Sequence, residues 1–158
     1  MLLKELQEYI NLNLEKKHFK VSKKICSEAI LCDCCSNIDE YLEQIENENK
    51  FQKLLFKHID SRNLKDSDVY NKVNIDRRLF SKIRSDINYH PSKETIILLA
   101  ISLELNEDEL VDLLNSASYS LPKNNIFDLI IRFCFERKIY DISKINEFLY
   151  TYKCKALN

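Results

Sequence analysis

Glycine does not occur anywhere among the 158 residues, and the chain has two prolines, Pro91 and Pro122. Tight β-hairpin turns and phosphate-cradling loops depend on glycine, because it adopts positive φ angles without a steric penalty. Its absence argues against a β-sandwich, a Rossmann dinucleotide-binding domain and a Walker-type nucleotide site. With 45% hydrophobic and 31% charged residues the chain can close a core under a wetted surface, and we expect an all-α protein.

Apolar residues at spacings of three and four predict helices along most of the chain. Residues 1–50 are expected to form three helices, the third beginning at the capping pair Ser36 and Asp39. A polar run at 46–50 marks a boundary, and Pro122 marks another. The predicted parts are an N-terminal helical segment at 1–50, a five-helix domain at 51–120 and a C-terminal helical hairpin at 121–158.

The charge of the chain is unevenly distributed, although the net charge is −1. Residues 57–93 hold nine basic and five acidic side chains, whereas the segments on either side carry a net negative charge. A chain of this balance is not coated in basic residues for nonspecific binding to nucleic acid. The basic window favours a local binding site instead.

The basic window contains a recognisable pattern of apolar, turn and capping residues. From Leu64 to Leu105 the sequence reads LKDSDVYNKVNIDRRLFSKIRSDINYHPSKETIILLAISLEL. Val69 and Val73 stand where a second helix packs, and Phe80 and Ile83 where a third helix faces a core. The segment resembles the lambda-repressor-like helix-turn-helix of the Cro and cI type. The resemblance implies a five-helix fold in which the third helix recognises DNA.

Local chemistry agrees with this assignment. The turn between the second and third helices needs a residue that tolerates positive φ, and Asn74 is the least penalised replacement for glycine there. Asp76 is a good N-cap for the following helix. When Phe80 and Ile83 face inward, the basic residues of the same helix project outward.

The resemblance implies that a recognition helix at 76–84 enters the major groove, where arginine makes bidentate hydrogen bonds to guanine. The expected base contacts come from Arg77, Arg78, Ser81, Lys82 and Arg84. The expected phosphate contacts come from Lys65, Lys72 and Lys93. We therefore expect a sequence-specific regulator of the repressor type with double-stranded DNA as its partner.

A second resemblance supports a competing function. The string from Asp66 to Ser85, together with residues 89–93 and 127–130, is similar to a helical module that ends many longer bacterial proteins. This resemblance implies that the helix-turn-helix and the C-terminal hairpin form one unit. A module joined to varied partners suggests a non-enzymatic adaptor that binds protein on the same scaffold.

Catalytic, metal and cofactor sites are not expected. Cys26, Cys32, Cys34 and Cys35 lack the paired spacing of zinc knuckles, so we expect buried thiols and no metal. The chain has no arrangement of His, Ser and acidic residues typical of catalysis, and His58 lies on an apolar helix face. We expect neither an enzyme nor a bound cofactor.

Location and assembly follow from two further features. Lys4, Glu5 and Glu8 interrupt the start of the chain before a signal peptide could form, and the apolar stretch 96–101 is too short to span a bilayer. We expect a cytoplasmic protein with reduced thiols. Aromatic residues are dense in 121–158, and Phe133 and Phe135 cannot both face one side of a helix. A homodimer formed through this aromatic surface is expected.

Overall fold

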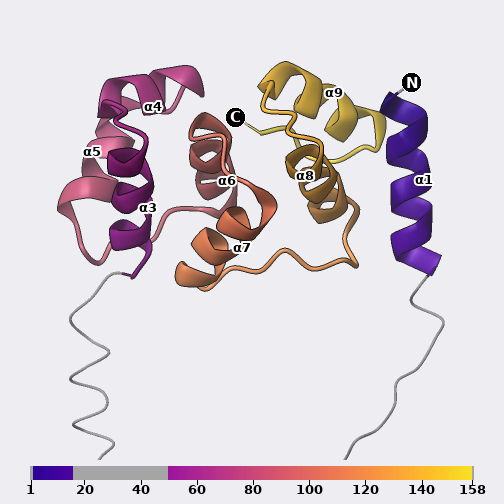
Figure 1. Cartoon of the computed structure of the whole chain (residues 1–158), viewed down its shortest axis with the longest axis horizontal. Coiled ribbons are helices and arrows are strands. Elements are labelled where there is room, and N and C mark those ends of the chain that lie inside the picture. The colour runs from indigo at the N-terminus through magenta and orange to yellow at the C-terminus, as the bar shows by residue number, and fades with distance from the viewer. Residues whose placement is uncertain (1, 16–49, 158) are drawn as a thin grey trace, which may run out of the picture.

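The computed structural model describes residues 2–15 and 50–157 (Figure 1). In these residues the regular structure is helical throughout, and the all-α prediction is confirmed. The helices are α1 (Leu2–Glu15), α3 (Lys50–Ser61), α4 (Asp66–Lys72), α5 (Arg77–Ser85), α6 (Lys93–Ser102), α7 (Glu107–Ser116), α8 (Ile126–Glu136) and α9 (Ile142–Thr151). The second and third helices expected before residue 50, with the Ser36–Asp39 pair and the Cys26–Cys35 cluster, lie outside the described residues.

Polar side chains begin the helices at the positions that the sequence indicates. The Asp76 carboxylate accepts from the backbone N–H of Arg78 at 2.6 Å. Asn106 and Glu109 form a reciprocal capping box with two hydrogen bonds of 2.9 Å. Such caps satisfy backbone N–H groups that have no partner within the helix.

Six helices of the described part end at a residue with positive φ, although none of these residues is glycine. In each case the next amide donates to the carbonyl five residues earlier, at 2.8 to 3.2 Å. This is the Schellman ending, in which glycine is the usual residue at the left-handed position. The six left-handed residues are Asn63, Asn74, Glu104, Ser118, Lys138 and Lys153. The chain therefore keeps sharp helix ends without glycine, at a conformational cost.

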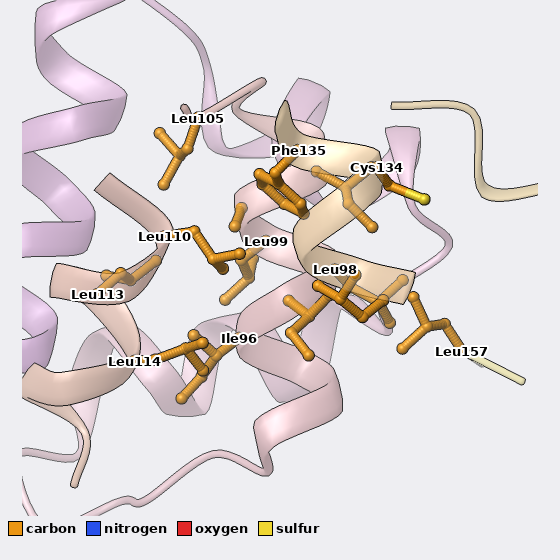
Figure 2. Close-up of a cluster of buried hydrophobic side chains, with 14 of the residues drawn as sticks. Ile96, Leu98, Leu99, Leu105, Leu110, Leu113, Leu114, Cys134, Phe135 and Leu157 are labelled. Atoms are coloured by element: carbon orange, nitrogen blue, oxygen red, sulfur yellow. The ribbon is translucent and has the colours of Figure 1, made fainter. Parts of the chain in front are cut away.

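The core runs through the centre of the helical assembly around α6. All the residues of α6 from Ile96 to Ser102 are buried, because α6 has α4 on one side and α7 on another. Figure 2 shows Leu99 of α6 beside Leu110 of α7 and Phe135 of α8. A helix that is apolar on all faces is stable only when neighbours surround it. The surrounding helices supply that environment.

The N-terminal helix packs against the C-terminal hairpin. Leu6 and Ile10 are buried, and the Tyr9 hydroxyl donates to Glu136 at 2.8 Å. The Tyr152 hydroxyl donates to Gln7 at 2.7 Å, which adds a contact near the end of α9. In Figure 1, α1 lies at the opposite side of the molecule from α3. The domain limits at residues 50 and 120 stay a prediction.

Phe133 and Phe135 of the hairpin lie inside the protein, whereas Tyr150 of α9 is 84% exposed. Phe133 is 1% exposed beneath Tyr9 and Phe148, and Phe135 is 2% exposed against Tyr140. Both sides of α8 are covered because α1 packs on it as well as α7 and α9. The open aromatic surface expected from Phe133 and Phe135 is absent here, and dimerisation stays a prediction without that support.

Candidate nucleic-acid interface

A short turn joins α4 to α5. Asn74 has a φ of 54°, which confirms the left-handed conformation expected at this position. Val73 and Ile75 on either side of it are buried, and the amide of Ile75 donates to the carbonyl of Tyr70 at 2.9 Å. The turn is thus anchored by two apolar side chains and one hydrogen bond, which fixes where α5 begins.

The inward face of α5 carries two buried residues, as the sequence predicts. Phe80 is 2% exposed and Ile83 is 1% exposed. The Phe80 ring lies 5.6 Å from the ring of Tyr70 in α4 and 6.4 Å from that of Phe56 in α3. Because this face is packed, the residues on the opposite face are exposed: Arg78, Ser81, Lys82 and Ser85.

The arginines of the chain differ in whether they have an internal partner. Four of the six form ion pairs with carboxylates: Arg62 with Glu109, Arg84 with Asp66, Arg132 with Glu107 and Arg137 with Glu5. Arg77 and Arg78 are exposed and form no ion pair with any described residue. Two guanidinium groups without a carboxylate partner therefore stand together in the first turn of α5.

Arg84, an expected base contact, joins α5 to its neighbours. One of its guanidinium nitrogens lies 2.7 Å from an oxygen of Asp66, the first residue of α4. The guanidinium carbon lies 4.3 Å from the centre of the Phe56 ring in α3. Both contacts would have to break for Arg84 to reach a base. Arg84 therefore holds α5 against α3 and α4 and is not part of the candidate interface.

The lysines expected to contact phosphates also differ in whether they form an ion pair within the fold. Lys93 lies 2.5 Å from Asp128, which is 1% exposed, and Lys72 lies 2.5 Å from Glu104. Lys65 is exposed and has no ion pair within the described part of the chain. Lys82 lies 4.6 Å above the ring of Tyr89, a contact that leaves its charge open to an anion. Lys65 and Lys82 thus remain available to DNA, whereas the charge of Lys93 is used within the fold.

Two lysines of α3 extend the basic surface. Lys53 and Lys57 are exposed, and each follows a residue that contacts α5, namely Gln52 and Phe56. Lys53 lies outside the basic window of the sequence. The spacing of four residues indicates that both lysines share one face of α3, but it does not show that this face adjoins α5.

His58, which lies outside this surface, has structural partners. Nδ1 of His58 lies 3.1 Å from a nitrogen of Arg62 and 3.8 Å from an oxygen of Glu109. Burial lowers the pKa of His58, against the opposing effect of Glu109.

In residues 2–15 and 50–157 no group of three His, Cys, Asp or Glu side chains is placed to hold a metal ion. No helix in that part is long and apolar enough to cross a membrane.

No protein-family model, curated protein or solved structure matches the chain. The candidate site is the exposed surface of α3, α4 and α5 that carries Lys65, Arg77, Arg78 and Lys82.

Proposed function

We propose that the protein is a DNA-binding regulator of the repressor type, in which α4 and α5 form a helix-turn-helix and α5 enters the major groove. The observation that carries this proposal is the pair Arg77 and Arg78. They are exposed at the start of a helix whose other face is packed, and neither has a carboxylate partner among the described residues. An arginine without an internal partner keeps all its donors for a ligand.

The positions on α5 suggest different tasks for the two arginines. Successive residues of an α-helix are about 100° apart, so Arg78 shares the outermost strip with Lys82, four residues later. Arg77 lies on the flank, on the same side as Arg84. Arg78 therefore faces the floor of the groove, where a bidentate contact to guanine is worth about 1–3 kcal/mol of discrimination. Arg77 is positioned for a base at the edge of the site or for a phosphate.

Neighbouring lysines supply the sequence-independent part of the affinity. Lys65 precedes α4, and Lys57 lies on α3 beside Phe56, which packs against α5. Contacts of ammonium groups with phosphates orient a protein on the duplex and make its binding dependent on salt. This arrangement predicts steep weakening of DNA binding as salt is added.

A protein partner is the competing hypothesis, and one observation favours it. Ile87 lies two residues after the end of α5 and is 53% exposed. An apolar side chain beside a basic helix also suits a protein surface with acidic and apolar residues. Added salt weakens such a complex less than it weakens a DNA complex.

Selection from random duplex DNA by the full chain at low salt tests the proposal. We expect enrichment of a motif that contains guanine, and loss of that enrichment in the Arg77→Ala, Arg78→Ala double variant. Arg137→Ala is the control for loss of one arginine elsewhere, to be compared with each single variant, because Arg137 is exposed and pairs with Glu5 of α1, which lies across the molecule from α5 in Figure 1. Absence of any motif for the unaltered chain would favour the protein-interaction module.

A further inference from the structure

The C-terminal end of α5 is built differently from the ends of the helices around it. α3, α4, α6, α7, α8 and α9 each end at a left-handed residue, whereas Asp86, the C-cap of α5, is extended with φ −105° and ψ 105°. A helix end without the Schellman hydrogen bonds must satisfy its last carbonyl groups in another way. A side chain from α3 reaches one of these carbonyls, that of Ile83, and also the carbonyl of Asp86, which accepts from the amide of Tyr89 at 3.1 Å as well.

Gln52 of α3 donates from Nε2 to the carbonyl of Ile83 at 2.6 Å and to that of Asp86 at 2.8 Å. A glutamine amide nitrogen carries two hydrogens, so each carbonyl receives one of them. Both acceptors are carbonyl oxygens, which fixes the orientation of the amide because its own oxygen would be repelled there. Gln52 lies 31 positions before Ile83 in the sequence, and its two hydrogen bonds hold the last turn of α5 against α3.

Arg84 adds a second connection at the same end. Its guanidinium group stacks on Phe56 and bonds to Asp66, so it joins the last turn of α5 to α3 and to the start of α4. The start of α5 is fixed by the turn that holds Val73 and Ile75 and by the Asp76 cap. With the start fixed there, the position of the last turn sets the direction of the helix axis and of the exposed side chains of Arg77 and Arg78.

We infer that Gln52 is a positioning residue for DNA recognition, because its amide fixes the end of α5 and thereby the direction in which Arg77 and Arg78 point. This inference rests on the proposed function. We do not expect Gln52 to contact a base. It acts through the backbone of α5, so its loss should reduce discrimination between sequences more than it reduces general attraction to DNA.

Three variants of the full chain separate this role from a general loss of stability. Gln52→Met keeps the length of the side chain and removes both donors. Gln52→Lys restores a donor that favours the carbonyl end of a helix. Gln7→Met is the control, because Gln7 of α1 accepts a hydrogen bond on the opposite side of the molecule. Gln52→Asn, one methylene too short for both carbonyls, replaces Gln52→Met if the latter does not fold.

The measurement is the ratio of the dissociation constants for nonspecific and selected duplexes, taken well below the melting temperature of each variant. We expect the ratio to fall about tenfold in Gln52→Met, as loss of modest hydrogen bonds predicts, with the salt slope unchanged. Gln52→Lys should recover most of the ratio, and Gln7→Met should match the unaltered chain. Backbone amides 84–88 should exchange hydrogen faster in Gln52→Met than in Gln7→Met.

Each other outcome has a distinct meaning. If Gln52→Met keeps the ratio while Arg78→Ala loses it, the inference is overturned and the proposed function stands. If Gln52→Lys fails to recover the ratio, the donor role of the side chain is wrong. If the unaltered chain selects no DNA motif, the proposed function fails and the inference fails with it.

Discussion

The ammonium group of Lys93 lies 2.5 Å from Oδ1 of Asp128, a carboxylate that is 1% exposed. The pair joins the first turn of α6 to the first turn of α8. A carboxylate removed from water is strongly destabilising unless a cation and hydrogen bonds compensate it. The charge of Lys93 is therefore part of the fold, although its place in the basic window suggested a phosphate contact.

Lys93→Met should destabilise the protein by about 3 kcal/mol, the lower end for breaking a buried pair, since Lys93 itself is partly exposed. Urea denaturation measures the change. Lys65→Met is the control, because Lys65 is exposed and has no ion pair with a described residue, and such a lysine should alter stability by less than about 0.5 kcal/mol. Equal stability of Lys93→Met and the unaltered chain would show that Asp128 does not depend on Lys93.

The Lys93–Asp128 pair could not be predicted from the sequence, whereas several features of α5 could. Features of α5 that depend on residues close in sequence were predicted: the left-handed Asn74, the Asp76 cap, and the inward Phe80 and Ile83. These features follow from helical periodicity and local hydrogen bonding.

The partners of Lys93 and Arg84 lie 35 and 18 residues away, and no local pattern links them. The packing of α1 on α8 likewise joins residues that are far apart in the sequence, since Tyr9 and Glu136 are separated by more than a hundred positions. That packing also buries Phe133, which the sequence alone left in a possible exposed aromatic surface. Spacing along one helix shows which residues share a face, and it does not show what covers that face.

Glycine should stabilise the chain at its left-handed helix ends. Lys138 and Lys153 are exposed with φ of 54°, a conformation that costs an L-residue roughly 1–2 kcal/mol. Lys138→Gly and Lys153→Gly should each raise the free energy of unfolding by about 1 kcal/mol or slightly less, after the entropy of glycine is deducted. Lys57→Gly, inside α3, should instead lower it by about 1 kcal/mol. Thermal or urea unfolding of the three variants decides this, and a loss of stability at the two helix ends would refute it.

Stability should decline in mildly acidic solution because of His58. Burial lowers the pKa of the folded ring, and Arg62 donates a hydrogen bond to Nδ1, which needs the neutral form. The unfolded chain then binds more protons below its ordinary histidine pKa of about 6.5. The contribution is complete above that pH and is lost as the pH falls toward the lower folded pKa. Glu109 and Asp112 oppose the shift, whereas Arg62 and Lys57 add to it.

The urea midpoint measured from pH 8 to pH 5 tests this expectation. His58→Gln, whose amide oxygen accepts from Arg62, should flatten the decline between pH 7 and pH 5. His90→Gln serves as the comparison, since His90 makes its contact with the backbone of Ala117 away from this cluster. An unchanged decline in His58→Gln would assign the pH dependence to other groups.

Lys65 should act on DNA without regard to sequence. If its ammonium group contacts a phosphate, Lys65→Ala should weaken binding to all duplexes alike and reduce the salt slope by roughly one unit. Titrations of a selected and an unrelated duplex at several salt concentrations measure both effects. A change confined to the selected duplex would mean that Lys65 reads a base or a local shape instead.

We propose that the exposed face of α5 reads DNA, and the affinity of Arg78→Ala for a duplex selected by the unaltered chain tests this directly. We predict a loss of about 1–3 kcal/mol on the selected duplex and a flattened preference among sequences, because a bidentate contact to guanine carries the discrimination. The fold should be retained, since Arg78 is exposed opposite Phe80 and Ile83. Failure of the unaltered chain to select any duplex at low salt, or full sequence preference in Arg78→Ala, would contradict the claim.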